Sequence, residues 1–195
     1  AELGVGYLTL YAFSTENWKR PHTEVNALMS LLVDTLRKEI ETLMKNDIRL
    51  WAIGDLSKLP SSTHRALLEG IEMTSENKRM TLVLALNYSA KWEILEATRQ
   101  LAAEAAAGKL KPQDIDDRAF ANALSTRGIP DPELLIRTSG ETRLSNFLLW
   151  QIAYAELYFT PTFWPDFRKE HLYEAIINFQ QRERRFGKIS EQIVK

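Results

Sequence analysis

Five short runs of apolar residues occur along the chain, and each has the character of a β-strand that is buried on both faces. The runs are rich in Leu, Ile, Val and aromatic residues and do not alternate strictly with polar ones, a pattern typical of parallel sheets. The predicted strands are residues 7–13, 48–53, 81–86, 134–136 and about 153–159.

Apolar residues between these runs recur at steps of three and four, which places them on one face of a helix. The longest such stripe runs from Val25 to Leu43 and predicts a helix over residues 22–46. Other patterns predict helices after Pro60, from about Ile94 to Gly108, over about 114–124 and over about 169–184. Strands that alternate with helices predict an α/β fold with a mostly parallel central sheet flanked by helices.

Composition narrows the class of protein. The chain has 195 residues, which suits a single domain over 1–195, and its 25 Lys plus Arg against 26 Asp plus Glu give a net charge of −1. A general nucleic-acid-binding protein would show a basic excess, so no nucleic-acid partner is expected. The absence of Cys excludes disulfides, thiolate catalysis and Cys-ligated zinc. No apolar run reaches the roughly 20 residues of a membrane span, and we expect a soluble, cytoplasmic protein.

Polar turns follow the predicted strands, at the edge where an open parallel sheet binds its ligands. Two of them, at 14–20 and 137–143, read STENWKR and RTSGETR, and the others begin Gly54-Asp55 and Asn87-Tyr88-Ser89. Guanidinium groups and hydroxyl donors suit phosphate oxygens. Any one of Arg20, Arg137 and Arg143 could equally be a salt-bridged surface residue. All three at one predicted edge favour an anion site.

Glu156 lies inside the apolar run 153–159. A lone buried carboxylate is costly, so this side chain should be paired with a cation or bound to a metal ion. From the pattern alone, a structural ion pair is the favoured interpretation. The acidic cluster at 114–117 precedes a weak helix and is expected to cap that helix rather than to bind metal.

The chain has more aliphatic residues than one helical stripe requires. Leu31 and Val33 fall off the main stripe of the helix 22–46, and the strand 81–86 adds three leucines. Packing in the core is the strong alternative for all of them. An apolar cavity beside an anion site would suit a diphosphate that carries a long hydrocarbon tail.

Four stretches of the chain are specific enough to compare with a known family. The two long ones read LTLYAFSTENWKRP at 8–21 and IRTSGETRLSNFLLWQIAYAELYF at 136–159, and the two short ones read WPDF at 164–167 and RERRFG at 182–187. Together they resemble the signatures of the cis-prenyltransferases, and most of all those of the bacterial undecaprenyl diphosphate synthases in that family. The resemblance extends from about residue 3 to residue 187.

The resemblance implies an enzyme that adds isopentenyl diphosphate repeatedly to an allylic diphosphate, usually farnesyl diphosphate, and forms a cis double bond each time. The product would be undecaprenyl diphosphate, the precursor of the lipid carrier for cell-wall synthesis, and Mg²⁺ would be required. The family fold is a mostly parallel sheet with flanking helices and a hydrophobic tunnel for the growing chain. Family members are homodimers, and the lipid product implies peripheral contact with the inner face of the membrane.

The resemblance also implies roles for residues of this chain. Substrate contacts are implied for Ser14, Thr15, Glu16, Trp18 and Arg20, and contacts with the isopentenyl diphosphate head for Arg137, Arg143, Leu144 and Ser145. Glu156 would be a magnesium ligand. The remaining site residues are Glu24, Met80 at the far end of the tunnel, and Arg185 and Gly187 in an Arg-x-Gly element that reaches the site of the partner subunit.

Asn17 holds the position that is often described in the family as the proton acceptor. A neutral amide is a very poor base. We therefore expect Asn17 to orient the diphosphate through hydrogen bonds, while a diphosphate oxygen takes the proton.

One element of the family is absent from these 195 residues. Upstream of the region where the chain starts, the family has a first strand that ends in Asp-Gly-Asn-Gly-Arg-Trp, with the principal magnesium-binding and catalytic Asp. Compared with the family, the chain is expected to be truncated at its N-terminus. We therefore expect the chain on its own to be inactive or nearly inactive. The alternative is a non-catalytic partner subunit of a heteromeric cis-prenyltransferase. It ranks lower, because such partners tend to lose the contacts that Asn17, Arg20 and Arg137 represent.

Overall fold

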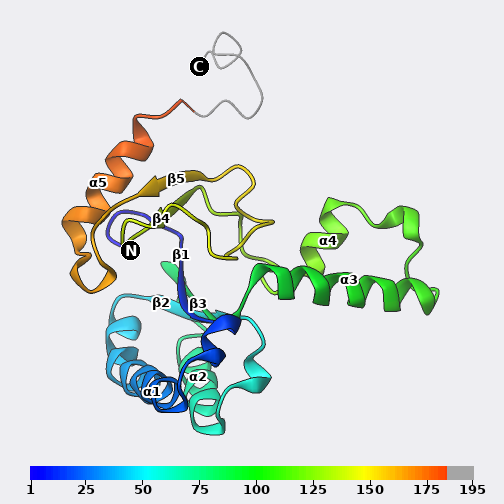
Figure 1. Ribbon diagram of the computed structural model, residues 1–195, viewed down its shortest axis with the longest axis horizontal. Coiled ribbons are helices and arrows are strands. Elements are labelled where there is room, and N and C mark those ends of the chain that lie inside the picture. Colours follow the sequence, from blue (N-terminus) through cyan, green and yellow to red (C-terminus); the bar gives the residue numbers. More distant parts are fainter. Residues whose placement is uncertain (184–195) are drawn as a thin grey trace. The chain divides into compact units, whose positions relative to one another are not determined.

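The computed structural model describes residues 1–183 (Figure 1). The chain divides into two compact units, one over Ala1–Pro130 and one that begins at Asp131. The single domain expected over 1–195 stays a prediction.

Three parallel strands form the sheet of the first unit: β1 (Tyr7–Ser14), β2 (Ile48–Ile53) and β3 (Met80–Tyr88). Their order is β1-β3-β2, so β3 is central. It is buried without a break from Val83 to Tyr88, as its apolar run predicts. The predicted burial on both faces is wrong for β1, where Tyr7 and Leu8 are 44% and 39% exposed. Among the described residues, this strand lies at the edge of the sheet and pairs only with β3.

Two helices, α1 (His22–Lys45) and α2 (Ser61–Met73), lie side by side against one face of this sheet (Figure 1). The predicted stripe of α1 faces inward, and the core that it joins contains Val25, Met29, Leu36, Leu43, Leu50, Leu67, Leu84 and Leu86. Leu31 is instead 61% exposed. The aliphatic surplus is therefore divided between the core and the surface, and the hydrophobic tunnel stays a prediction.

Beyond β3 the chain forms α3 (Ala90–Ala106), which extends away from the sheet with α4 (Asp117–Ala123) beside it (Figure 1). The helix predicted over 114–124 is shorter than expected, since Pro112–Asp114 forms a separate 3-10 turn. The carboxylate of Asp116 accepts a hydrogen bond from the backbone N–H of Ala119 at 2.7 Å. The expected capping role of the acidic cluster is confirmed.

The second unit contains two parallel strands, β4 (Leu134–Arg137) and β5 (Glu156–Phe159), and the helix α5 (Lys169–Gln180) next to β5 (Figure 1). Strand β5 is shorter than predicted, because residues 153–155 belong to the turn before it. Helix α5 likewise ends before residue 184. Arg185 and Gly187 lie outside the described residues.

The strand pairings within residues 1–183 are all parallel, and a helix follows each strand except β4, which a loop connects to β5. The predicted α/β class with a mostly parallel arrangement is therefore confirmed. Across the same residues, no helix combines the length and the apolar character that crossing a membrane would require.

Candidate active site

The first candidate segment begins where β1 ends. Ser14 is the last residue of β1, and the 3-10 helix η1 (Thr15–Lys19) follows directly. The backbone N–H of Ser14 donates a hydrogen bond to Oδ1 of Asn17 at 2.8 Å. Asn side chains often hold a tight turn in this way. The bond occupies Oδ1 and leaves the Nδ2 group of Asn17, a double donor, without a hydrogen-bond partner among the described residues.

The charged residues around η1 are exposed and loosely paired. Arg20 forms an ion pair with Glu24 at 2.8 Å across the start of α1, and both side chains are 48% exposed. The hydroxyl of Thr15 donates to the carboxylate of Glu16 at 3.1 Å. Exposed pairs of this kind contribute little to stability, so Arg20 can exchange Glu24 for another anion at small cost.

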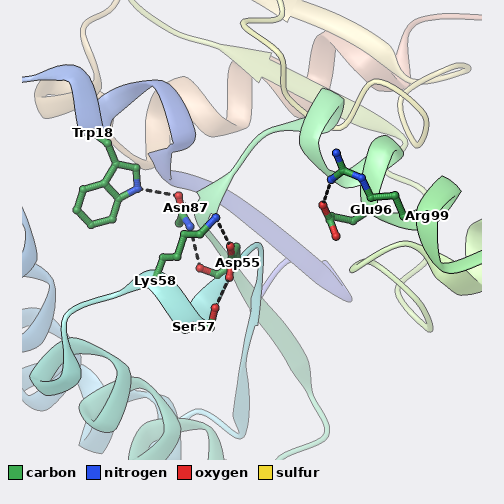
Figure 2. A network of polar contacts seen from close by, with 7 residues as sticks. All are labelled: Trp18, Asp55, Ser57, Lys58, Asn87, Glu96 and Arg99. Atoms are coloured by element: carbon green, nitrogen blue, oxygen red, sulfur yellow. Dashed lines mark hydrogen bonds and ion pairs between the residues drawn. The ribbon is translucent and has the colours of Figure 1, made fainter.

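Trp18 is the best-anchored side chain of η1. Its indole Nε1 donates a hydrogen bond to Oδ1 of Asn87 at 2.7 Å (Figure 2). Its ring also meets Phe13 edge-on, with the ring centroids 5.0 Å apart. Asn87 is only 3% exposed. The sequence prediction did not assign Asn87 to the site, although it named the polar turn that begins at Asn87, after the predicted strand 81–86.

Two groups of the first unit, one just after β2 and one within β1, have shifted pKa values. Hydrogen bonding from Ser57 lowers the pKa of Asp55 below its ordinary value, with a further contribution from Lys58 at 2.9 Å (Figure 2). Burial raises the pKa of Tyr11 to about 12, and the negative charge of Glu16 adds to the rise. Neither Asp55 nor Tyr11 was a predicted site residue.

The second candidate segment begins at the end of β4. Arg137 is the last residue of that strand, and its Nε atom is buried without a hydrogen-bond partner. A buried N–H group that stays unpaired is costly and calls for an explanation. Arg49, which also has a buried Nε, instead stacks over the Trp51 ring at 5.1 Å.

The loop after Arg137 has an unusual backbone. Ser139, Ser145, Asn146 and Leu148 all have positive φ values, from 46° to 70°. Such conformations are uncommon outside glycine, and they cluster at functional sites. The predicted residues Leu144 and Ser145 are half-buried in this loop, and Arg143 is exposed and paired with Glu141.

Glu156, the first residue of β5, is less buried than the sequence pattern indicated, since 28% of its side chain is exposed. Its Oε2 accepts a hydrogen bond from Arg182 at 2.7 Å, so the ion pair favoured by the pattern is present. Within residues 1–183, no group of three or more His, Asp or Glu side chains is placed to hold a metal ion.

The predicted site residues therefore form two sets. Ser14–Arg20 and Glu24 lie together at the carboxyl end of β1 in the first unit, and Arg137, Arg143–Ser145 and Glu156 lie on β4, β5 and their connection in the second. Met80 begins β3 and is 7% exposed, at the opposite end of that strand from Asn87. The convergence of Arg20, Arg137, Arg143 and Glu156 at one rim stays a prediction.

Comparison with known proteins gives the family of the chain. Residues 1–187 match the family model described as "Putative undecaprenyl diphosphate synthase". The chain belongs to this family of cis-prenyltransferases. An isoprenyl transferase from Chlorobaculum tepidum is 54% identical over 99% of this chain and 73% of its own length. A ditrans,polycis-undecaprenyl-diphosphate synthase ((2E,6E)-farnesyl-diphosphate specific) from Vibrio cholerae is 48% identical over 99% of this chain and 77% of its own length.

Two solved structures of cis-prenyltransferases share the fold. Lavandulyl diphosphate synthase from Lavandula x intermedia, crystallised with dimethylallyl diphosphate, superposes with a TM-score of 0.93 at 40% identity, over 96% of this chain and 81% of its own. A probable undecaprenyl diphosphate synthase from Campylobacter jejuni superposes with a TM-score of 0.82 at 37% identity, over 94% of this chain and 84% of its own. The identification made from the four sequence signatures is confirmed.

Proposed function

We propose that the reaction of this cis-prenyltransferase is the condensation of isopentenyl diphosphate with farnesyl diphosphate, with cis stereochemistry, toward undecaprenyl diphosphate, and that the 195 residues alone are inactive or nearly so. Family membership over residues 1–187 supports the reaction class. The name of the Vibrio cholerae relative specifies farnesyl diphosphate, which supports that starter. The guanidinium groups of Arg20, Arg137 and Arg143, which suit phosphate oxygens, support the substrate class.

The observation that carries the proposal is the unpaired Nε of Arg137. In residues 1–183 the side chain of Arg137 forms no ion pair or hydrogen bond, although it ends a strand and is partly buried. A diphosphate oxygen would satisfy the guanidinium, which binds phosphate through two parallel N–H groups. Arg143 and the serine hydroxyl of Ser145 follow on the same strained loop and would add donors to the same head group.

The η1 segment of the first unit offers hydrogen-bond donors of its own. Because Oδ1 of Asn17 already accepts from Ser14, this side chain can only donate to a substrate through Nδ2. Asn17 is therefore suited to orient a diphosphate and unsuited to accept a proton. As the carbon–oxygen bond to the leaving diphosphate breaks, negative charge grows on its oxygens, and fixed donors such as Asn17 Nδ2 and Arg20 stabilise that charge.

Mg²⁺ is the cation that we propose for the reaction, and Glu156 would be its protein ligand. Mg²⁺ is usually held by one or two carboxylates together with substrate phosphates and water. Glu156 fits such a shared site, because within residues 1–183 its Oε1 has no hydrogen-bond partner and its Oε2 is paired only with the partly exposed Arg182. Bound Mg²⁺ would neutralise part of the charge of the leaving diphosphate.

The family resemblance also supports a homodimer and peripheral contact with the membrane through the lipid product. The size of the protein in solution, measured by light scattering, tests the dimer. Co-sedimentation with vesicles, with and without bound product, tests the membrane contact.

Calorimetric titration of isopentenyl diphosphate into the unaltered chain and into R137M tests the proposal. We expect R137M to bind about tenfold more weakly or worse, because it loses charge-assisted hydrogen bonds to phosphate. Its thermal stability should be preserved, since no intramolecular bond of Arg137 is lost. The control is R118M, which removes an exposed arginine of α4 and should bind as the unaltered chain does. Equal affinity of R137M and R118M would refute the role of Arg137.

Turnover separates the enzyme from its alternative. Protein expressed from the complete reading frame should incorporate radiolabelled isopentenyl diphosphate into a polyprenyl product in the presence of farnesyl diphosphate and Mg²⁺. A non-catalytic partner subunit would bind the substrate and form no product.

A further inference from the structure

One side-chain amide joins three segments at the carboxyl end of the first sheet. Asn87 lies at the end of the central strand β3 and is 3% exposed. Its Oδ1 accepts the hydrogen bond from Trp18 in η1 at 2.7 Å, and its Nδ2 donates to the backbone carbonyl of Asp55 at 2.8 Å (Figure 2). Its own carbonyl accepts from the backbone N–H of Asp55 at 3.2 Å. Asn87 thus connects the segments that follow β1 and β2.

The geometry of this position favours asparagine over other residues. Its φ angle is +47°, in the left-handed region that Asn tolerates better than most residues. The site needs an acceptor toward Trp18 and a donor toward Asp55, and a primary amide supplies both. An aspartate would keep the acceptor and lose the donor, and a glycine would lose both while keeping the backbone conformation.

The support beneath Asn87 is rigid. A Cβ atom built on the neighbouring Gly54, whose φ is +113°, would lie 2.0 Å from the carbonyl oxygen of Leu86. The end of β2 therefore approaches the backbone of β3 as closely as sterics allow. The hydrogen bond from Trp18 to Asn87 fixes the rotation of the Trp18 indole. The edge-on contact with Phe13 alone would leave the indole free to rotate.

The geometry points to Asn87 as a positioning residue for substrate binding: its hydrogen bond to Trp18 holds η1 in the conformation that presents Asn17 and Arg20 to the diphosphate. This inference rests on the proposed function, because it assumes that η1 binds the diphosphate. Asn87 itself need not touch the substrate. It acts through Trp18, which is the neighbour of Asn17 on the same tight turn.

A measurement on the unaltered chain comes first. The indole N–H resonance of Trp18, assigned by its loss in W18F, should exchange with solvent more slowly than that of Trp164, which is 58% exposed. Exchange of Trp18 as fast as that of Trp164 would overturn the inference, since no hydrogen bond would then hold the ring.

Three variants then separate positioning from stability. N87G removes both side-chain bonds, N87D keeps the acceptor for Trp18, and T74V is the matched control. Thr74 is fully buried, and its hydroxyl donates to Gly70 at 2.8 Å and accepts from the backbone N–H of Leu50 at 2.9 Å. T74V therefore removes buried hydrogen bonds in the same unit without touching Trp18.

Affinity for farnesyl diphosphate is the deciding readout, because its diphosphate is the leaving group that η1 is proposed to hold. We expect N87G to bind about tenfold more weakly or worse and to lose the protection of the Trp18 N–H, because misplaced contacts sharply weaken recognition. N87D should keep the protection and stay within about threefold of the unaltered chain, less than the tenfold step of about 1.4 kcal/mol. T74V should lower the thermal midpoint and leave the affinity unchanged.

The contrary results are equally specific. If N87G binds as tightly as the unaltered chain, the positioning role is wrong while the proposed function stands. The positioning role is also wrong if N87D loses affinity while its Trp18 N–H stays protected from exchange. This second comparison decides the question if N87G does not fold. If the unaltered chain does not bind farnesyl diphosphate at all, the proposed binding of a diphosphate by η1 fails and the positioning role fails with it.

Discussion

The carboxylate of Glu156 and the guanidinium of Arg182 form an ion pair at 2.7 Å, although they are 26 residues apart in the sequence. Glu156 begins β5, and Arg182 follows the end of α5. The pair ties the helix to the strand in the second unit. It also occupies one oxygen of the only carboxylate proposed as a magnesium ligand. A structural role and a metal-binding role for Glu156 therefore predict different outcomes when either partner is removed.

We predict that E156Q weakens Mg²⁺ binding in the presence of isopentenyl diphosphate by about tenfold or more, because even indirect partners of a metal site contribute that much. R182M should bind Mg²⁺ more tightly than the unaltered chain, since a competing cation is gone. Each variant should lose less than about 1 kcal/mol of unfolding free energy, as is usual for a partly exposed pair. Calorimetry and urea unfolding measure the two effects. Unchanged Mg²⁺ affinity in E156Q would contradict the role of Glu156 as a metal ligand and would support a structural role in the ion pair.

The close approach of Gly54 to Leu86 gives a prediction about stability. A methyl group at residue 54 would lie 2.0 Å from the Leu86 carbonyl, with a backbone φ of +113°. We expect G54A to cost about 3 kcal/mol or more, because the clash adds to the backbone strain. Gly128, with a φ of +81° and open space around it, is the control, and G128A should cost about 1–2 kcal/mol. Similar losses in urea unfolding would contradict the close approach.

The fold could be predicted well where the hydrophobic pattern is long and regular. The stripe from Val25 to Leu43 predicted α1 to within one residue at its end, and the runs at 48–53 and 81–86 fall within β2 and β3. Boundaries were less certain where turns interrupt apolar sequence. Residues 153–155 have a strand-like composition, yet they form a turn before β5. The exposure of β1 depends on its place at the sheet edge, which periodicity does not encode.

The candidate site could be predicted where its chemistry is visible in the residue type. Arginines after a strand indicate anion binding, and Glu156 inside an apolar run indicated a paired carboxylate. The sequence placed Asn87 at the start of a polar turn but did not indicate its partners, which lie far away in the sequence. Glu93, outside the candidate site, shows the same limit. Glu93 sits in a helical pattern like any polar residue, yet it is 2% exposed and accepts hydrogen bonds from Tyr88 at 2.6 Å and from the hydroxyl of Ser125 at 2.6 Å.

The acid side of the stability profile should depend on Asp55. Its pKa is lowered in the folded chain, chiefly by the hydrogen bond from Ser57 at 2.6 Å. The ordinary value in an unfolded chain is about 3.9. The stabilisation by ionised Asp55 is therefore complete above that value and is lost as the pH falls through the lower folded-state pKa.

S57A should raise the pKa of Asp55 toward its ordinary value, because it removes the largest single cause of the lowering, and K58M should raise it as well, because it removes a hydrogen bond and a neighbouring positive charge. Carbon NMR titration of the Asp55 carboxyl measures both shifts. D55N should flatten the acid branch of the urea-unfolding profile relative to the unaltered chain. An Asp55 pKa that is the same in S57A and the unaltered chain would contradict this assignment.

The alkaline side should depend on Tyr11. Burial raises its pKa to about 12, and Glu16 adds to the rise, whereas an unfolded tyrosine titrates near about 10. Between these values the unfolded chain releases a proton that the folded chain retains, so the unfolding free energy should fall as the pH rises from about 10 to 12. Y11F should remove this part of the loss, although it also removes the hydrogen bond from the Tyr11 hydroxyl to the carbonyl of Tyr88 at 3.1 Å. The ultraviolet titration of tyrosinate, taken as the difference between the unaltered chain and Y11F, gives the Tyr11 pKa directly. E16Q is the matched variant that keeps the Tyr11 ring and its burial, and it should lower the Tyr11 pKa by removing the neighbouring negative charge. A difference titration centred at the ordinary tyrosine value would show that Tyr11 is solvated in the folded chain, which would contradict the prediction.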